Sequence, residues 1–359
     1  KEELYKMLTP LTNEYGNWIQ NQEQKIKEPN FLPDENSRDI VSRKIRDDAK
    51  IALSRIQNGI DTLMSDEKAF EAFKFANMAI AWQQTMSKWA KENVEHDDVK
   101  GIDPLEPDDS RWEKPRWRLF QIAFILMNLE SITNPHSINR ETVDLLWFPT
   151  GGGKTEAYLG LVAFVVSYRR LRGKNQEGNI TDKSLGTSVL MRYTLRLLTV
   201  QQFQRAAALM CACEKVRVHD KQKWGTVPFQ VGLWVGASVT PNTRKQAKQQ
   251  KNKLIYQSAD QDLTQIQNKN PYILINCPWC GKKLKANNGE ISGTPEQWRL
   301  FCGRTKCMFS KKDNDKDRSL PIVVVDEDVY SRCPSLIIAT VDKFAQISWR
   351  DDVKAIFGK

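Results

Sequence analysis

The sequence has no hydrophobic run long enough to cross a membrane. A membrane-spanning helix needs roughly 18 or more consecutive apolar residues, whereas the most apolar stretch, residues 158–166, is short and predicts a buried helix. The N-terminal residues do not have the pattern of a signal peptide. The chain also does not begin with Met, so we expect a piece of a longer protein. The lack of a spanning run argues against a membrane protein.

Acidic residues are fewer than basic ones, and no internal repeat is evident. The 54 Lys and Arg against 44 Asp and Glu give a formal net charge of +10. This excess suits a polyanionic partner such as nucleic acid, although a basic surface that serves only solubility carries the same charge. The 40% hydrophobic and 27% charged content is that of a soluble globular protein, and 359 residues are enough for two or three domains.

Residues 1–110 are predicted to form an N-terminal helical region. Apolar residues recur three and four positions apart from Phe75 through Met78 and Trp82 to Trp89, which makes one apolar helix face. We expect Trp82 and Trp89 to pack in a core rather than to stack on nucleic acid. Proline, glycine and aspartate then cluster between residues 97 and 115, which predicts a linker.

Residues 111–359 are predicted to form an α/β domain. Strand patterns at residues 188–191, 229–235 and 335–339 alternate with helical patterns such as residues 197–215. This alternation is typical of a parallel sheet covered by helices. Residues 240–320 interrupt the rhythm and are predicted to be an insertion. It begins with a polar run, residues 244–253, that holds five positive charges and no acid.

A glycine-rich segment at residues 149–155, Pro-Thr-Gly-Gly-Gly-Lys-Thr, separates the apolar run 143–148 from a helical pattern at 156–168. A strand, such a loop and a helix together make a phosphate-binding loop. Lys154 is predicted to reach the β- and γ-phosphates of ATP and the Thr155 hydroxyl to ligate Mg²⁺, so these two residues are the catalytic candidates. Backbone N–H groups and the helix N-terminus favour the phosphates. The predicted nucleotide-binding residues of the loop are Thr150, Gly151, Gly152, Gly153, Lys154 and Thr155.

Four of the seven cysteines form two pairs, which predicts a zinc ribbon at residues 275–310. Asn288-Gly289, a hairpin-turn signal, lies between the pairs. Four thiolates suit tetrahedral Zn²⁺ better than an iron–sulfur cluster or unligated thiols, and they leave no position for a catalytic water, so the site is structural. The predicted metal ligands are Cys277, Cys280, Cys302 and Cys307.

The remaining three cysteines, Cys211, Cys213 and Cys333, lie in apolar segments and are expected to be buried. This cysteine usage fits a reducing cytoplasm better than a disulfide framework. The ribbon also carries basic residues, which either contact nucleic acid or form a solvated face. Both interpretations stay open for Lys282, Lys283, Lys285 and Arg304.

The order of motifs around the loop resembles superfamily 2 helicases and translocases. Gln121 precedes the loop by about 30 residues, where such motors place a glutamine that contacts adenine. Residues 192–197 resemble the first strand-binding motif, residues 231–236 the next, and residues 336–343 the apolar strand and Thr that contact the tracking strand. The resemblance implies backbone-phosphate contacts, which are sequence-neutral, from Arg192, Thr194, Arg196, Thr340 and Lys343. Phe148 departs from the pattern, since Ala or Gly usually stands there.

The segment Ile322-Val323-Val324-Val325-Asp326-Glu327-Asp328 looks like a Walker B strand, but its position argues against that role. In superfamily 2 motors the Walker B acids follow the strand that ends in the Thr motif, and Asp326 precedes Thr340. We therefore expect the Walker B acids and the arginine finger, which phosphate-loop hydrolysis requires, to lie beyond residue 359. The 359 residues alone are predicted to be a poor ATPase.

Three phrases carry a closer resemblance, at residues 145–161, 191–198 and 339–345. They are similar to the helicase of DISARM anti-phage defence systems, the DrmA-type proteins. The resemblance implies a first RecA-like motor lobe with an inserted Cys₄ zinc ribbon. It also implies a second lobe, a DrmB-type partner protein, and action on DNA, as a single strand or a duplex junction, in a bacterial cytoplasm. The alternative is another phosphate-loop ATPase or switch with a structural zinc module that is not driven by nucleic acid.

Overall fold

The computed structural model describes residues 1–28, 34–92, 115–149, 151–193, 196–236, 239–258, 273–285, 291–293, 298–311 and 318–357. The chain divides into two compact units. Unit 1 consists of Lys1–Lys74 and Arg116–Leu161, and unit 2 of Phe75–Pro115 and Val162–Lys359. The predicted linker falls almost entirely outside the described residues, so the boundary near residue 110 stays a prediction.

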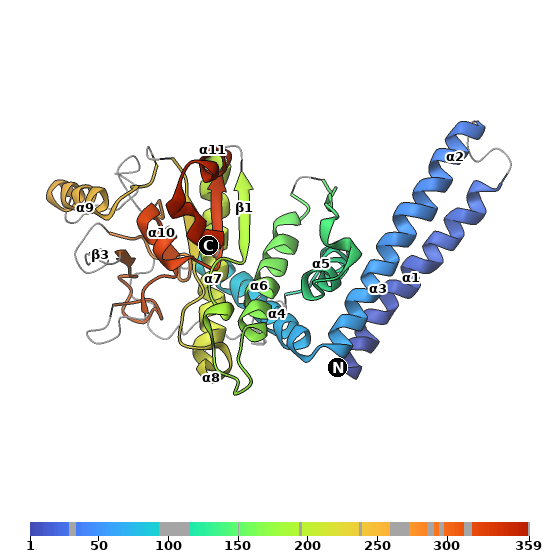
Figure 1. Ribbon diagram of the computed structural model, residues 1–359, viewed down its shortest axis with the longest axis horizontal. Coiled ribbons are helices and arrows are strands. Elements are labelled where there is room, and N and C mark those ends of the chain that lie inside the picture. Colours follow the sequence, from blue (N-terminus) through green and yellow to red (C-terminus); the bar gives the residue numbers. More distant parts are fainter. Residues whose placement is uncertain are drawn as a thin grey trace. The chain divides into compact units, whose positions relative to one another are not determined.

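Unit 1 is helical, as predicted for the N-terminal region, and Figure 1 shows α1 running alongside α2 and α3. Gly59 lies where α3 and α5 approach each other. A Cβ at this position would come within 1.9 Å of the Leu126 carbonyl oxygen, so only glycine fits the crossing. Ile60 and Leu126 are fully buried near this crossing. The elements of unit 1 are α1 (Glu2–Ile26), α2 (Glu35–Arg43), the π-helix η1 (Lys44–Ala49), α3 (Lys50–Ser65), the start of α4 (Glu67–Glu92), α5 (Leu119–Thr133), the 3₁₀ helix η2 (Ile138–Glu141) and the start of α6 (Lys154–Arg172).

Unit 2 contains a four-stranded parallel sheet in the order β1-β6-β2-β5. The predicted α/β class with a parallel sheet is thus confirmed, and each of the three predicted strands overlaps an observed one. The strands are β1 (Val189–Tyr193), β2 (Val231–Trp234), β5 (Ile322–Val323) and β6 (Leu336–Thr340). Every residue of β2 and β6 is buried, as expected of central parallel strands covered on both faces.

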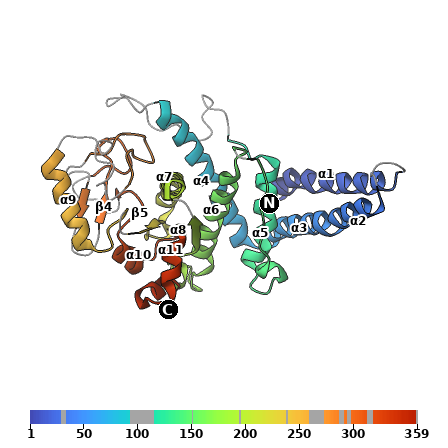
Figure 2. The same ribbon diagram turned by 90° about the horizontal axis from the view of Figure 1, so that it is seen from above.

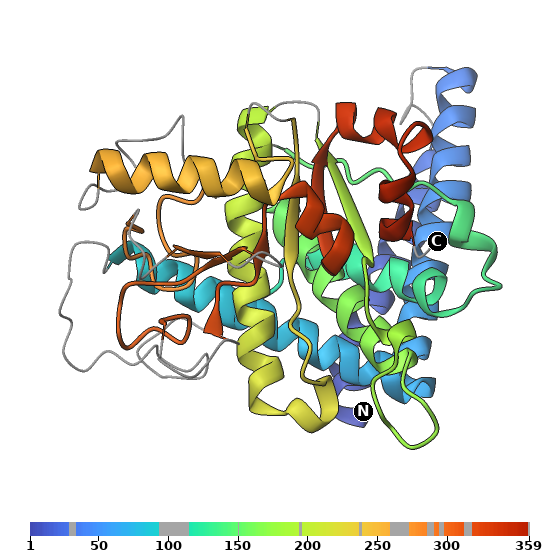
Figure 3. The same cartoon turned by 60° about the vertical axis from the view of Figure 1, so that its left-hand side comes forward.

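Helices cover the sheet. Figure 3 shows the yellow-green α7 beside the strands and the red C-terminal segments over them. Trp234, Ile337 and Ala339 form a buried cluster with α10 and η7. The helical elements of unit 2, besides the ends of α4 and α6, are η3 (Asp182–Ser184), α7 (Arg196–His219), α8 (Lys221–Trp224), α9 (Arg244–Ser258), α10 (Asp326–Arg332), α11 (Val341–Ala345), η6 (Gln346–Ser348) and η7 (Asp351–Phe357).

The predicted insertion contributes α9 and a small antiparallel sheet of β3 (Ile291–Gly293) and β4 (Trp298–Leu300), which lie close together in Figure 2. The hairpin signal at Asn288-Gly289 lies outside the described residues. The apolar face of α4 is buried as predicted at Trp82 and Trp89, whereas Met78 is 49% exposed and does not belong to it. In the parts of the chain that the structure describes, no helix has the length and hydrophobicity to cross a membrane.

The segment before the glycine-rich loop differs from its prediction. Residues 142–149 are not part of any strand, and the side chains of Val143, Leu145 and Trp147 are 92%, 86% and 89% exposed. A strand requires a neighbouring strand for its ladder hydrogen bonds. Among the described residues of unit 1 there is none. The apolar pattern of residues 143–148 therefore predicted a strand, but no neighbouring strand in the described part of unit 1 pairs with this segment.

Candidate nucleotide site, strand ends and metal centre

The glycines of the loop are there for two physical reasons. Gly151 and Gly153 have φ angles of +78° and +90°, which side-chain-bearing residues rarely adopt. A Cβ on Gly152 would come within 2.4 Å of the Phe148 ring, and one on Gly153 within 2.7 Å of the Gln121 amide nitrogen. The loop therefore turns sharply while its backbone packs against two side chains. Thr150 lies outside the described residues.

Lys154 begins α6, and its side chain folds back over the loop. Its ammonium donates hydrogen bonds to the carbonyl oxygens of Phe148 and, at 3.2 Å, of Pro149. Thr155 follows in the first turn of α6 and is partly buried. The carbonyls of Phe148 and Pro149 thus hold the Lys154 ammonium beside the glycine-rich loop. The N-terminus of α6 begins here, and the N–H groups at a helix N-terminus favour anions.

The start of α5 braces the loop from behind. Gln121 is 4% exposed, and its Nε2 donates to the Gly153 carbonyl at 2.8 Å while its Oε1 accepts from the Arg118 backbone N–H at 2.8 Å. The Arg118 guanidinium donates to the Gly152 carbonyl at 2.9 Å. These contacts fix two consecutive loop carbonyls. The predicted contact of Gln121 with adenine stays a prediction, since a primary amide keeps a second proton and further lone-pair capacity.

Phe148, which departs from the family pattern, has a specific packing partner. Its ring stacks on Phe120, with centroids 3.9 Å apart and an interplanar angle of 14°. Phe120 directly precedes Gln121, so one turn of α5 supports the loop through an aromatic contact and an amide contact. The sequence singled out Gln121 and Phe148 separately. It carried no signal that Phe120 and Arg118 join them.

Two of the predicted nucleic-acid motifs lie side by side at the carboxyl ends of β1 and β6, which we call the sheet edge. β1 and β6 are parallel neighbours, and Tyr193 is in register with Thr340. Arg192 is exposed near the end of β1. Thr340 ends β6 and is 2% exposed, and its hydroxyl has no hydrogen-bond partner among the described atoms. Thr194 and the Arg196 side chain lie outside the described residues.

Lys343 does not face solvent, which differs from the predicted phosphate contact. Its side chain is 4% exposed, and its ammonium lies 2.6 Å from the carboxylate of Asp326, which is 1% exposed. Burial raises the pKa of Asp326, and the hydrogen bond from Lys343 opposes that rise. The physical reason for the difference is that a carboxylate from α10 faces α11 at this depth and holds the ammonium inside.

The neighbouring acids of α10 also have protein partners. The Glu327 carboxylate accepts from the Arg244 backbone N–H at 2.9 Å. Asp328 accepts from the Arg244 guanidinium at 2.6 Å and from the Trp298 backbone N–H at 3.1 Å. The carboxylates of all three acids at the start of α10 thus bind other groups of unit 2. Because these carboxylates already have protein partners, the contacts favour the prediction that Asp326 and Glu327 are not Walker B residues.

The four predicted metal ligands form one buried cluster, with Sγ atoms all within 4.8 Å of one another. None of the four is in a disulfide, and the sulfurs of Cys280 and Cys302 lie 3.4 Å apart. The first pair is shaped by a turn in which the Gly281 N–H donates to the Cys277 carbonyl at 2.9 Å, with Gly281 at φ +73°. Four soft ligands at this spacing could hold Zn²⁺ and leave no open coordination position.

Aromatic residues fasten the metal centre to α4. Trp279, between the first two cysteines, lies 5.8 Å from Trp82 and 6.1 Å from Phe309, measured between ring centroids. The Arg304 guanidinium lies 5.3 Å from the Trp89 ring and donates to the Cys280 carbonyl at 3.2 Å. This location gives Arg304 a role in holding the centre together, a role that the basic pattern of the ribbon did not predict.

The parallel sheet, the helix that begins at a Gly-Lys-Thr loop and the buried four-cysteine cluster define an α/β protein with a cluster of thiols that could hold a metal ion. No family model matches the chain. The chain is 36% identical, over 368 aligned residues, to DISARM protein DrmA of Bacillus paralicheniformis. The match covers all of this chain, which therefore belongs to the DrmA-type DISARM proteins. The chain spans about 30% of the length of that relative.

Proposed function

We propose that the chain is the first motor lobe of an ATP-dependent DNA helicase or translocase that acts in bacterial anti-phage defence. The observation that carries the proposal is the braced Gly-Lys-Thr loop. Two of its glycines have positive φ angles, and its carbonyls are held by Arg118 and Gln121. Such bracing presents loop N–H groups in a fixed geometry, which phosphate binding and transfer require.

In this proposal Lys154 exchanges its two carbonyl contacts for the β- and γ-phosphates of ATP. The Thr155 hydroxyl ligates Mg²⁺, and Gln121 uses its remaining donor and acceptor capacity for the base. Mg²⁺ would neutralise the charge that develops on the phosphates. Because the α10 acids are engaged elsewhere, the residue that orients the attacking water comes from outside residues 1–359, and these residues alone are a poor ATPase.

DNA binding is proposed at the sheet edge where β1 and β6 end. The register of Tyr193 with Thr340 supports it, because the two motifs that the sequence assigned to one strand lie side by side. Arg192 is the exposed cation of this edge, and Thr194 and Arg196 follow it in the chain. Lys343 is proposed to act indirectly, by fixing the start of α11 through Asp326.

The name of the relative, a DISARM protein, supports the defence role. We propose on the same ground that the protein works in the bacterial cytoplasm with a DrmB-type partner. Zn²⁺ is proposed to occupy the four-cysteine cluster as a structural ion. A metabolic or signalling ATPase with a zinc module is the competing function, and its turnover would not depend on DNA.

ATP hydrolysis by the full-length protein, with and without single-stranded DNA, tests the proposal. We expect DNA to stimulate hydrolysis and Lys154→Ala to abolish it. Lys183→Ala, an exposed lysine on η3, is the matched control and should hydrolyse ATP like the wild type. Turnover that is unaffected by DNA would support the competing ATPase, and full activity of Lys154→Ala would remove the loop from the mechanism.

A further inference from the structure

The cations of α9 have no acidic counterpart on their own helix. The helix contains five Lys and Arg residues and no Asp or Glu. Lys245 and Lys248 are three positions apart, as are Lys248 and Lys251, and like charges that are neighbours on a helix surface destabilise the helix. Arg244 and Lys245 lie in the first turn, where the helix dipole disfavours cations. The folding of α9 therefore gains nothing from this charge pattern.

α9 is nevertheless held by unit 2 at its N-terminus. The Arg244 guanidinium donates to Asp328 at 2.6 Å, and its backbone N–H donates to Glu327 at 2.9 Å. The Gln246 backbone N–H donates to the Thr243 hydroxyl at 3.2 Å, and the Gln246 Oε1 accepts from the Thr243 backbone N–H at 3.2 Å. This reciprocal pair caps the helix. Because Asp328 neutralises Arg244, the lysines carry the net charge of α9.

One face of α9 is covered, and the lysines outside it are open to solvent. Ala247 is 1% exposed, and four positions later the Lys251 ammonium lies 5.9 Å from the ring centroid of Trp298 on β4. Figure 2 shows α9 beside β4 at the periphery of unit 2. Among the described residues, the three lysines outside this face are exposed and have no acidic partner: Lys245, Lys248 and Lys253. Their charge is therefore available to an anion.

The segment after the four-cysteine cluster adds a further cation. Lys311 is exposed and directly follows Ser310, whose N–H donates to the Cys307 carbonyl at 3.0 Å. Partial burial lowers the pKa of Lys251, and the charge of Lys311 lowers it further. The two ammonium groups thus lie close enough to repel each other, and a bound anion would relieve this repulsion.

We propose that this basic surface, made of α9 and Lys311, binds the phosphate backbone of double-stranded DNA. The proposal rests on the proposed DNA motor and adds a contact surface outside the phosphate loop and the sheet edge. Gln249 and Asn252 are exposed between the lysines, and side-chain amides, like lysines, donate hydrogen bonds to phosphate oxygens. Such contacts hold a duplex without reading its sequence, which suits a motor that moves along DNA.

The composition of the basic surface favours a duplex over other partners. Residues 244–253 contain one apolar residue, the buried Ala247. The centres of protein interfaces and the helices that lie on membranes need apolar or aromatic side chains. Proteins that bind single strands without sequence preference stack the bases on aromatic residues. A duplex keeps its bases stacked and presents its phosphates, so lysines and amides are sufficient to bind it.

Anisotropy of a fluorescent blunt-ended DNA duplex, titrated with the full-length protein without nucleotide, tests the proposal. Each duplex phosphate contact contributes about 0.9 to the slope of log K against log salt. Lys245→Gln/Lys248→Gln should therefore flatten the slope by about 1.8, so that a rise from about 50 to about 200 mM salt weakens the wild type about 12-fold more than the variant. Gln is as good a helix former as Lys, so the melting temperature should not fall.

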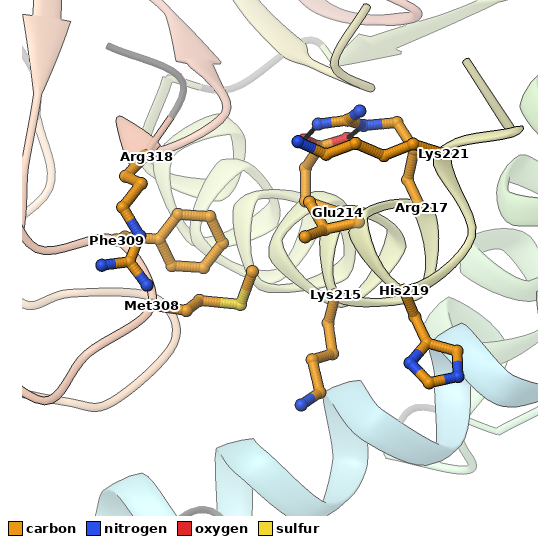
Figure 4. A pocket seen from close by; sticks show the side chains of 9 residues that line it. Glu214, Lys215, Arg217, His219, Lys221, Met308, Phe309 and Arg318 are labelled. Carbon is orange, nitrogen blue, oxygen red and sulfur yellow. Dashed lines mark hydrogen bonds and ion pairs between the residues drawn. The ribbon is translucent and has the colours of Figure 1, made fainter. Parts of the chain in front are cut away.

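Lys183→Gln/Lys221→Gln is the matched control, because it removes the same charge from two exposed lysines of η3 and α8. Lys221 lines a cavity beside α7 to which α9 contributes no residue (Figure 4). The control should keep the wild-type slope. An equal loss in the control would reduce the effect to net charge and overturn the proposal, and so would an unchanged slope in Lys245→Gln/Lys248→Gln.

Two further outcomes separate the basic surface from other partners and from the proposed function. An equally large effect on a single-stranded oligonucleotide would overturn the assignment to a duplex. Unchanged duplex binding by the variant, together with loss of a co-purifying acidic protein, would assign the surface to that protein and also overturn it. ATP hydrolysis that ignores DNA while duplex binding still depends on α9 would refute the proposed motor and leave the basic surface standing.

Discussion

The buried pair of Lys343 and Asp326 gives the sharpest quantitative prediction, through replacement of Lys343 by Met. The substitution keeps the length and apolar stem of the side chain but removes the ammonium 2.6 Å from Asp326. The other Asp326 oxygen already has no hydrogen-bond partner among the described atoms. The variant would therefore bury a carboxylate that has lost its counter-ion.

Breaking a buried pair by removing one partner destabilises a protein by about 3–5 kcal/mol. For a unit the size of unit 2, each kcal/mol lowers the melting temperature by roughly 2–4 °C. The Lys343→Met variant should consequently melt roughly 10 °C lower at neutral pH. Asp326→Leu combined with Lys343→Met should recover most of the loss, because replacing both partners by apolar groups leaves no unpaired charge.

The loss should depend on pH, with a sign that follows from Asp326. Burial raises the pKa of this carboxyl in the folded protein, and Lys343 lowers it. Without Lys343 the pKa of Asp326 in the folded state rises further. A raised folded-state pKa of an acid costs stability above the unfolded pKa, and this cost disappears as protonation proceeds on lowering the pH. The deficit of Lys343→Met should therefore be smaller at pH 5 than at pH 7.5.

Calorimetric melting of the full-length protein at the two pH values measures these effects. Lys354→Met is the matched control, because Lys354 is also ion-paired, with Asp351, but its side chain is 57% exposed. Its melting temperature should stay near that of the wild type. Equal effects of the two substitutions, or a Lys343→Met deficit that grows toward acid pH, would refute the assignment of Lys343 to a buried pair.

Three further predictions concern the loop and the metal centre. Gly152→Ala should weaken ATP binding by about 3- to 10-fold, measured by calorimetric titration, because its Cβ would displace the Phe148 ring and the stacking that is worth about 0.5–1.5 kcal/mol. Adding Phe148→Ala should cause little further loss, because the stacking on Phe120 that it removes is already disrupted. Gln121→Leu removes two hydrogen bonds of about 1 kcal/mol each, so ATP affinity should fall while zinc content, measured by elemental analysis, is unchanged. Cys307→Ser should lower the bound zinc, whereas Cys333→Ser should retain it, and the opposite result would misplace the metal centre.

Local patterns in the sequence were sufficient for much of the fold. The alternating strand and helix patterns located β1, β2, β6 and α7 within a few residues, because each element carries its own periodicity. The cysteine spacing located the four-cysteine cluster for a similar reason, since each pair lies within six residues of chain. These features depend on neighbours in sequence, which a single sequence displays directly.

Contacts between distant residues could not be predicted in this way. The motif that contains Thr340 and Lys343 indicated one shared role, but only Lys343 meets the carboxylate of Asp326, which lies 17 positions earlier. Gln121 likewise reaches the Gly153 carbonyl across 32 positions. A motif records which residue types are present. It does not record which backbone or carboxylate lies opposite them in the folded chain.

The apolar run before the loop is a second case in which a distant contact decides the structure, because here the sequence predicted a strand that does not form. Its composition is that of a buried strand, yet Val143, Leu145 and Trp147 are exposed and residues 142–149 join no ladder. Composition records how well side chains would fit a covered sheet, whereas the strand itself requires hydrogen bonds from a second chain segment. The described part of unit 1 supplies helices only, so the loop is held in place from the helical side. Phe120, Gln121 and Arg118 thus support the loop from the start of α5, and the stacking on Phe120 gives the large side chain of Phe148 a packing partner.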